Sequence, residues 1–385
     1  MRIALFTYGT QARGGVVHTL ALGEALQDLG YDACVYALDA AGGAFHRQPR
    51  CPCVLLPVEP GHPGIVGFVR VRIEAYVRAL QGNALSFDVY HAQDGISGNA
   101  LATLVTSGAV PRFVRTVHHM DDFAQTELLA LQDRAIVTAA SHFVVSERWR
   151  KVVRERYGID AAVVANGVDL ERFAPVTRAA RARLRERLGF GSRPHFLSIG
   201  GVEARKNTIG TLEAFALVRA ARPDARLVVA GGASVFDHGA YRRTFEARAA
   251  QLGLRLGEDV IDAGIVSDET IVDLLRAADA FVFPSFVEGF GLVLLEALAC
   301  ATPVVTSATR PFSEFLSERD AILVDPHDST AIATGMRRAL EPSIARELGA
   351  RGLQIAQHYS WAASAQAHLS RYHDVAARAK ERVRA

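Results

Sequence analysis

Two carboxylates and two glycines lie close together after an apolar segment of residues 280–283, which predicts a buried strand. Residues 292–299 are good helix formers and predict a helix. A glycine loop before a helix N-terminus presents backbone N–H groups and a dipole that favour an anion. Glu288 lies in the loop and Glu296 in the helix, and carboxylates prefer hydroxyls to phosphate as partners. The stretch favours a ligand with phosphate and polyol parts, such as a nucleotide sugar; a tight turn followed by a solvated acid is the alternative.

This stretch resembles the signature of the retaining glycosyltransferases of family 4, which have the GT-B fold. The resemblance implies two Rossmann-like parallel-sheet domains that face each other across a cleft. It implies that Glu288 holds the donor sugar and that Glu296 holds the ribose of the nucleotide. It also implies donor contacts from the backbone of Gly289, Phe290, Gly291 and Leu292. The matching segments are Pro284-Ser285, Glu288-Gly289-Phe290-Gly291, Glu296-Ala297 and Pro303-Val304-Val305.

Basic side chains follow the predicted strand of residues 195–200. Arg205 offers a planar fork and Lys206 a point charge, which suits a phosphate clamp, although an exposed basic turn is the alternative. The family pairs an Arg just after a first glycine, here Gly200, with a Lys five residues later. Lys206 matches this Lys, whereas Gly201 stands where the Arg is usual. We therefore expect Arg205 to replace the missing cation, and the resemblance adds Gly200 to the donor contacts.

The N-terminal segment predicts a βαβ unit, with strands at residues 3–8 and 32–38 and a helix at residues 16–29. Gly14 and Gly15 lie between the first strand and the helix, without the spacing of a dinucleotide fingerprint. A plain βα turn is one interpretation of these glycines. The resemblance implies that they lie near the diphosphate and the acceptor.

A histidine follows the predicted strand of residues 113–117. Carboxyl ends of strands in open α/β sheets face the ligand crevice, although a single histidine there is often structural. Thr116-Val117-His118 resembles the Thr-x-His motif of the family, which implies that His118 approaches the donor sugar. We expect no role for His119.

Three further features come from the resemblance. Gly231, after the predicted strand of residues 226–230, is expected near the nucleotide, and the backbone at Ile265 and Val266 near the base. Asn166-Gly167-Val168-Asp169 resembles the segment that crosses between the two domains. Ala301 stands where glycine is usual, and we expect only a small local shift.

The length of 385 residues predicts two domains. We place an acceptor-binding domain at residues 1–172 and a donor-binding domain at residues 190–358, with a last helix of about residues 361–385 packing back on the first. Residues 40–64 are rich in Gly and Pro and predict a long irregular connection. We expect Ser146 and Ser267 to cap the helices that follow them.

Bulk composition excludes several classes. The chain is 50% hydrophobic and 22% charged, as in globular proteins, and a net charge of +2 does not suggest nucleic acid. The four cysteines lack zinc-like spacing and predict unbonded thiols. The N-terminus leads into a strand rather than a signal peptide, and no apolar run spans a bilayer, so we expect a cytoplasmic enzyme. The basic helix of residues 65–80 predicts a solvated face; a peripheral membrane or acceptor contact is the alternative.

Together these features predict a hexosyltransferase-like enzyme that moves a sugar from a nucleoside diphosphate sugar to an acceptor hydroxyl with retention. The acceptor is a sugar, a lipid-linked molecule or a small molecule. We expect no cofactor and no metal, since no Asp-x-Asp pair stands at a strand end and cations already face the diphosphate. Two alternatives remain: another GT-B enzyme, such as a sugar-nucleotide epimerase or a phosphorylase, and a non-catalytic nucleotide-sugar-binding scaffold, which Gly201 suggests.

Overall fold

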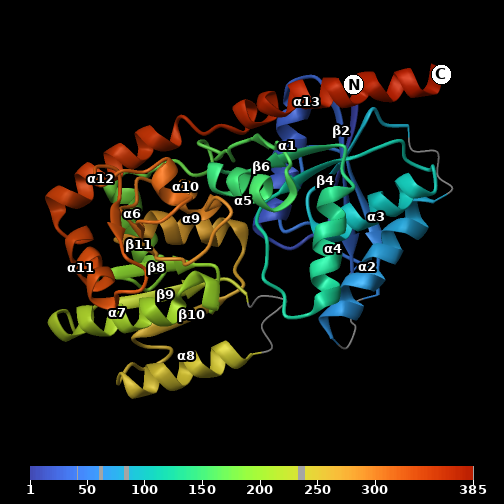
Figure 1. The fold of residues 1–385 in the computed structure, drawn as a ribbon. Coiled ribbons are helices and arrows are strands. Elements are labelled where there is room, and N and C mark those ends of the chain that lie inside the picture. Colours follow the sequence, from blue (N-terminus) through green and yellow to red (C-terminus); the bar gives the residue numbers. More distant parts are fainter. Residues whose placement is uncertain (41, 60–63, 82–85, 233–238, 385) are drawn as a thin grey trace. The chain divides into compact units, whose positions relative to one another are not determined.

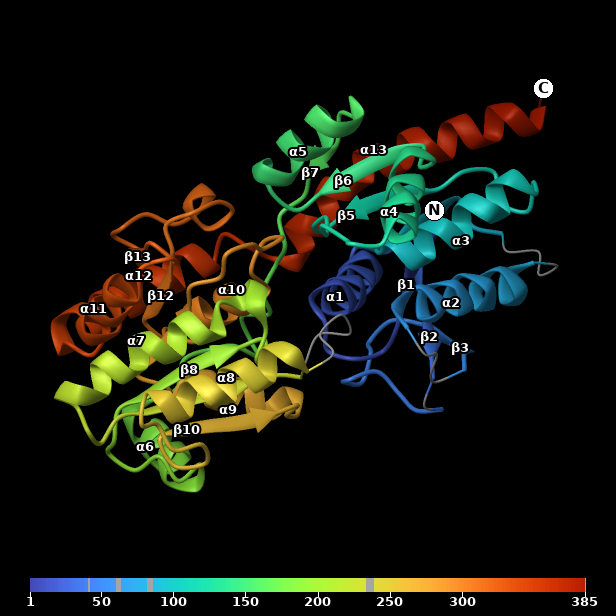
Figure 2. The same ribbon diagram turned by 60° about the horizontal axis from the view of Figure 1, so that its bottom comes forward.

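The computed structural model describes residues 1–40, 42–59, 64–81, 86–232 and 239–384, which form two compact units. Unit 1 comprises Met1–Gly167 and Trp361–Ala385, and unit 2 comprises Val168–Ser360. Figures 1 and 2 show the elements of both units.

The elements of unit 1 are β1 (Arg2–Thr7), α1 (Gly14–Asp28), β2 (Asp32–Asp39), β3 (Cys53–Pro57), α2 (Ile65–Leu80), β4 (Val89–Ala92), α3 (Gly95–Thr106), β5 (Val114–Val117), α4 (Thr126–Val137), β6 (Ser141–Val144), α5 (Glu147–Tyr157), β7 (Ala162–Val163) and α13 (Trp361–Arg384). Those of unit 2 are α6 (Arg178–Arg187), β8 (His195–Ile199), the 3-10 turn η1 (Ala204–Lys206), α7 (Thr208–Ala221), β9 (Arg226–Ala230), α8 (Ala240–Gln251), β10 (Val260–Gly264), α9 (Asp268–Ala277), β11 (Ala280–Phe283), α10 (Leu292–Ala299), β12 (Val304–Ser307), the 3-10 turn η2 (Phe312–Glu314), β13 (Ile322–Val324), α11 (Ser329–Ala339) and α12 (Pro342–Ala356).

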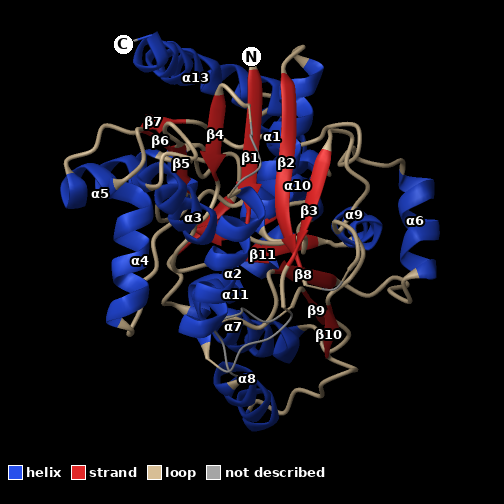
Figure 3. Cartoon of the chain, turned by 90° about the vertical axis from the view of Figure 1, so that its right-hand side faces the viewer, coloured by secondary structure: helices blue, strands red, loops and turns tan. Residues whose placement is uncertain are grey.

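Unit 1 is built on a parallel sheet of seven strands in the order β3-β2-β1-β4-β5-β6-β7. Figure 3 shows β2, β1 and β4 as neighbouring strands. The side chains of β1 alternate between two cores. Ile3 and Leu5 pack in one core with α1 and α13, whereas Ala4 and Phe6 pack in the other with α2 and α3. Helices on both faces explain why the strands are continuously apolar.

Unit 2 is built on a parallel sheet of six strands in the order β10-β9-β8-β11-β12-β13. Phe196 of β8 and Leu227 of β9 pack on one face against Phe215 of α7 and Phe245 of α8. Met336 of α11 belongs to the same core. The two parallel α/β units confirm the predicted fold class.

The last helix, α13, belongs to unit 1 although it follows all of unit 2. Ala365, Leu369 and Tyr372 of α13 are buried in one core with α1. The chain divides after Gly167 and before Trp361. We predicted that the first domain ends at residue 172 and that the last helix begins at about residue 361. The N-terminal bound therefore falls earlier than predicted, at the Asn-Gly of the crossing segment.

Two local predictions are wrong. The connection at residues 40–64, of which residues 41 and 60–63 lie outside the described part, contains β3, whose apolar residues pair with β2 as an edge strand. Flanking prolines and glycines conceal this short strand in the sequence. Ser146 lies at the N-cap position of α5 but makes no side-chain cap hydrogen bond. Ser267 does cap α9, accepting a hydrogen bond from the backbone N–H of Thr270 at 3.2 Å.

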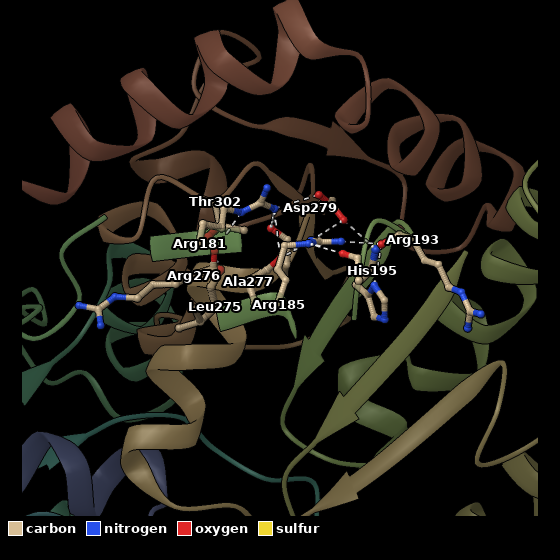
Figure 4. Close-up of polar contacts among 11 residues, drawn as sticks. Arg181, Arg185, Arg193, His195, Leu275, Arg276, Ala277, Asp279 and Thr302 are labelled. Atoms are coloured by element: carbon tan, nitrogen blue, oxygen red, sulfur yellow. Dashed lines mark hydrogen bonds and ion pairs between the residues drawn. The ribbon is translucent and has the colours of Figure 1, made fainter. Parts of the chain in front are cut away.

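An arginine network fixes α6 to the start of β8 and the end of α9 (Figure 4). The Asp279 carboxylate accepts hydrogen bonds from Arg181 at 2.8 Å, from Arg185 at 3.0 Å and from the backbone N–H of His195 at 2.9 Å. Arg185 also donates to the carbonyl of Ala277, which ends α9, at 2.6 Å. One half-buried carboxylate thus holds three elements of unit 2 together.

Candidate active site

Two cations converge on one carboxylate oxygen in unit 2. Glu288 Oε1 accepts hydrogen bonds from Arg205 Nη1 at 3.0 Å and from Lys206 Nζ at 2.6 Å. Glu288 is 6% exposed, and the ammonium group of Lys206 lies 4.6 Å from the centre of the Phe283 ring. Burial lowers the pKa of Lys206, and the charge of Glu288 opposes this shift. The structure therefore brings together three residues that the sequence places in one phosphate- and sugar-binding site.

Backbone contacts hold these side chains in place. Arg205 and Lys206 lie in η1, directly after β8. The carbonyl of Arg205 accepts a hydrogen bond from the backbone N–H of Phe286 at 3.0 Å, and Arg205 Nη1 donates to the carbonyl of Val287 at 3.1 Å. The loop after β8 is thus bonded to the loop after β11. Since the two strands are adjacent and parallel, their carboxyl ends meet at one edge of the sheet.

The glycine at position 201 has a structural reason. Gly201 has a φ of +75°, and a Cβ atom there would lie 2.4 Å from the carbonyl oxygen of Gly232. The backbone after β8 therefore packs directly on the backbone after β9, and a side chain does not fit between them. An arginine at this position is sterically excluded, whereas Arg205 reaches Glu288 from four residues further on.

The loop before α10 offers backbone rather than side chains. Gly291 has a φ of +100°, and a Cβ atom there would lie 2.7 Å from Phe312. The Phe290 side chain is buried and stacks on Phe315 with ring centres 5.0 Å apart. The buried Phe290 side chain and the conformation of Gly291 thus leave the backbone of this loop, rather than the Phe290 ring, for any contact with a ligand, and the donor contacts of Gly289–Leu292 stay a prediction.

Glu296 lies on α10 near a second ion pair. Burial raises the pKa of Glu296 to about 7; Arg172 opposes this shift and Asp268 adds to it. Arg172 Nη2 lies 2.6 Å from Asp268 Oδ2. Arg172, in the segment after the predicted crossing motif, was not singled out in the sequence. Arg172 comes close to Asp268 and Glu296 only because the folded chain brings its segment onto α9, and no local sequence pattern indicates this contact.

Glycines gather where β8, β9 and β10 end. The backbone N–H groups of Gly200 and Gly201 both donate to the carbonyl of Ala230, and that of Gly231 donates to Gly264. Ile265, just after β10, is 76% exposed, and its Cγ1 would lie 2.8 Å from a Cβ atom at Gly232. Val266 follows it and is half-buried. These residues lie on the same carboxyl edge as Lys206.

Unit 1 brings together a second group of predicted site residues. Gly14 and Gly15 open α1, and a Cβ atom at Gly15 would lie 3.9 Å from His118 Cδ2. His118 Nε2 lies 3.1 Å from Gln93 Oε1, so that Nε2 carries the proton and Nδ1 keeps a lone pair. Burial lowers the pKa of His118 well below its usual value, which keeps the ring neutral at pH 7.

Further buried histidines surround His118 and were missed in the sequence. The His18 ring centre lies 4.7 Å from that of His118, and His18 Nδ1 donates to Asn166 Oδ1 at 2.8 Å. His18 lies on α1 and Asn166 just before the end of the first segment of unit 1. A lone histidine on an apolar helix carries no signal of such a contact, although the Asn-Gly motif marks one partner.

Among residues whose placement is known, no group of three or more His, Cys, Asp or Glu side chains is arranged to hold a metal ion. No helix in that part of the chain has the length and apolar character needed to cross a membrane.

The fold and the unit 2 site define the chain as a GT-B glycosyltransferase. Residues 12–172 match the family model described as Glycosyltransferase Family 4, and residues 180–351 match that of glycosyl transferases group 1. The chain belongs to this family and is an enzyme that transfers glycosyl groups.

Curated relatives are similar over most of the chain. A D-inositol 3-phosphate glycosyltransferase from Xylanimonas cellulosilytica is 33% identical over 74% of this chain and 72% of its own length. A mannosylfructose-phosphate synthase from Agrobacterium fabrum is 30% identical over 84% of this chain and 78% of its own length.

Solved structures share the fold. Sucrose-phosphate synthase from Thermosynechococcus elongatus has a TM-score of 0.80 at 24% identity, covering 98% of this chain and 99% of that chain. HepE from Anabaena, in complex with UDP-glucose, has a TM-score of 0.81 at 19% identity, covering 97% of this chain and all of that chain. At these identities the likeness establishes the fold alone.

Proposed function

We propose that this glycosyltransferase moves a sugar from a nucleoside diphosphate sugar to an acceptor hydroxyl, with retention of configuration and without a metal. The observation that carries the proposal is the convergence of Arg205 and Lys206 on Glu288. Two cations at a strand end beside a helix N-terminus suit a diphosphate, and a carboxylate suits the sugar hydroxyls. The complex of HepE with UDP-glucose makes UDP-sugars the first donors to test.

In the proposed reaction, Arg205, Lys206 and the amides before α10 stabilise charge on the leaving diphosphate. Glu288 and the backbone of Gly289–Leu292 orient the sugar, while Glu296 binds the ribose. The acceptor oxygen bonds to the anomeric carbon on the face from which the diphosphate leaves, and the acceptor proton passes to a diphosphate oxygen. His118 keeps an unprotonated Nδ1 that accepts a hydrogen bond from a sugar hydroxyl.

The test is a thermal-shift screen of UDP, GDP, ADP and their sugars, with Lys206→Ala and Glu296→Ala as variants. A ligand that binds only the folded state raises the melting temperature. One nucleotide series that stabilises the wild type but not the variants supports the site. Hydrolysis of that donor then distinguishes an enzyme from a non-catalytic binding protein. Loss of this activity on addition of EDTA would contradict the metal-independent mechanism.

Arg205 is expected to act as the second diphosphate cation. Because its guanidinium contacts the same oxygen as Lys206, Arg205→Ala should lower kcat nearly as much as Lys206→Ala, by about 100-fold. Steady-state turnover with the preferred donor measures both variants, and Arg222→Ala, in an exposed ion pair, is the control. Near-normal turnover of Arg205→Ala overturns this role.

A further inference from the structure

One arginine of α2 is buried, and within the described part of the chain no carboxylate forms an ion pair with it. Arg72 is 6% exposed, and its guanidinium carbon lies 3.4 Å from the centre of the Phe68 ring. Its one hydrogen bond to the described residues is a long one, from Nη1 to the carbonyl of Phe68 at 3.4 Å. Burial lowers the pKa of Arg72, and the only group that opposes this shift is the phenol of Tyr8. A buried cation is costly unless an anion compensates it.

The position of Arg72 follows from its neighbours on α2. Phe68, Arg72 and Tyr76 are spaced by four residues and therefore lie on one face of the helix. The Tyr76 hydroxyl lies 2.5 Å from the carbonyl oxygen of Thr7, the last residue of β1. Because α2 connects the parallel strands β3 and β4, it runs from the carboxyl edge of the sheet back to the amino edge. Arg72, one turn before Tyr76, thus lies beyond the end of β1.

Polar groups of other elements meet Arg72 at this edge. Tyr8 follows β1, and burial raises its pKa to about 12 while Arg13 and Arg72 oppose the shift, so the phenol is neutral at pH 7. Arg13 is the N-cap residue of α1. The nearby carboxylate of Asp94 is occupied by backbone, since it accepts hydrogen bonds from the N–H groups of Tyr8 and Ser97 at 2.8 Å each. Among the described residues, no carboxylate forms an ion pair with Arg72.

We propose that Arg72 binds a phosphate group on the acceptor, so that the acceptor class is a phosphorylated sugar or polyol. This inference rests on the proposed function, in which Arg205 and Lys206 already serve the donor diphosphate. A guanidinium binds phosphate through two parallel hydrogen bonds, and the neutral hydroxyl of Tyr8 donates another. The phosphate is only a handle: no bond to it forms or breaks when the acceptor hydroxyl reacts.

A binding experiment with the full-length protein tests the site without turnover. Inorganic phosphate is titrated by calorimetry into the wild type, Arg72→Met and Arg78→Met. Arg78 lies on the same helix but is exposed and paired with Glu74, so its variant makes the same charge change elsewhere. We expect Arg72→Met alone to weaken phosphate binding, while UDP binding stays unchanged in all three. Equal phosphate binding by the wild type and Arg72→Met counts against a soluble phosphate ligand, and it overturns the proposal if vesicle binding is also independent of Arg72.

A kinetic experiment tests the acceptor class. Paired acceptors, inositol with inositol phosphate and glucose with glucose 6-phosphate, are compared at saturating donor. The wild type should prefer the phosphorylated member by about 10- to 100-fold in KM, the usual contribution of a hydrogen bond to a charged group. Arg72→Met should erase this preference without changing KM for the unphosphorylated member, and Arg72→Lys should restore part of it. A purely structural role of Arg72 would change both members alike and would refute the inference.

A failure of the proposed transferase function can be told apart from a failure of the Arg72 proposal. Donor hydrolysis without acceptor reports the unit 2 site alone, so its absence counts against the transferase mechanism and not against Arg72. A second experiment, with vesicles that contain phosphatidic acid, distinguishes a lipid phosphate from a soluble one. Arg72-dependent sedimentation with these vesicles, but no response to soluble phosphates, assigns a lipid phosphate; Arg72-dependent use of soluble phosphates assigns a free one. Arg72-independent behaviour in both arms overturns the proposal.

Discussion

The carboxylate of Glu288 contacts both Arg205 and Lys206, so the proposed donor diphosphate would compete with it for the two cations. Arg205 and Lys206 are held near one oxygen before any anion arrives, so little side-chain entropy is left to lose on binding. The same ion pairs compensate the burial of Lys206. The carboxylate that is proposed to bind sugar thus also keeps the phosphate-binding cations in position.

Glu296 is expected to make stability depend on pH. Its pKa of about 7 in the folded state exceeds the usual value, so the folded state binds more protons than the unfolded state in this range. Stability should therefore fall as pH rises from about 4.5 to 7 and change no further through this group above that. Glu296→Gln removes the buried charge and should gain on the order of 2 kcal/mol over the wild type at pH 8 and almost nothing at pH 4.5.

Urea denaturation at both pH values measures this difference. Glu246→Gln, on an exposed position of α8, is the control and should follow the wild type. A Glu296→Gln variant whose advantage is equal at both pH values contradicts an elevated pKa.

The sequence indicated most residues of the candidate site, but it did not indicate which further side chains contact them. Glu288, Lys206 and Glu296 stand in a motif whose spacing carries the information. The structure places Arg205 against Glu288, and the role of Arg205 as the replacement cation stays a prediction. Gln93 and Arg172 lie outside any motif. Gln93 meets His118 across adjacent strands, and such a contact depends on register rather than on local sequence.

At the level of elements, α10 ends on a strained residue. Thr302 N–H donates to the carbonyl of Ala297, and Ala301 N–H donates to that of Leu298, the bonds of a Schellman motif. Ala301 accordingly has a φ of +56°, where glycine is usual. The hydrogen bonds of this helix end are thus conventional, and its unfavourable feature is the backbone conformation of Ala301.

Ala301→Gly should relieve this strain. A left-handed conformation costs a residue with a Cβ atom about 1 kcal/mol, so the variant should be more stable by about that amount. Thermal and urea denaturation measure the gain. Ala297→Gly, four residues earlier and inside α10, should instead destabilise by at least about 1 kcal/mol, because glycine disfavours helix interiors. A loss of stability in both variants would show that position 301 carries no strain.

The arginine network of α6 should depend on Asp279. Asp279→Ala leaves the guanidinium of Arg185, a residue only 8% exposed, without its carboxylate, and should destabilise unit 2 by about 3 kcal/mol. Asp224→Ala breaks an exposed pair with Arg222 and should cost less than about 1 kcal/mol. Calorimetric melting compares the two; similar small losses would mean that the network does not fix α6.

Strong local patterns predicted some elements to the residue. The bounds of α2, β9, β11 and α10 agree with those inferred from the sequence, since each is a clear apolar or helix-forming run between breakers. The edge strand β3 escaped because it is short and stands among prolines and glycines. Its pairing with β2 is a tertiary contact that local propensity does not contain.

At the level of the whole molecule, each unit has its own core, and α13 contributes to that of unit 1. Leu369→Ala should destabilise unit 1 by about 3 kcal/mol, because Leu369 is 6% exposed in the core shared with α1. Hydrogen exchange should show weaker protection of β1 and β4, with β8 and β11 unchanged. Met336→Ala, in the core of unit 2, should give the opposite pattern. Equal loss in all four strands would mean that the units do not unfold separately.

The return of α13 to unit 1 sets the order in which the nascent chain can complete its two halves. When residues 1–167 leave the ribosome, their sheet still lacks the helix that buries Tyr372 and Leu369 against it, and that helix is synthesised only after all of Val168–Ser360. When α13 is being synthesised, unit 2 already has every element of its own core and can fold first. The half that is synthesised earlier is therefore completed later, and its apolar face stays exposed until α13 is available.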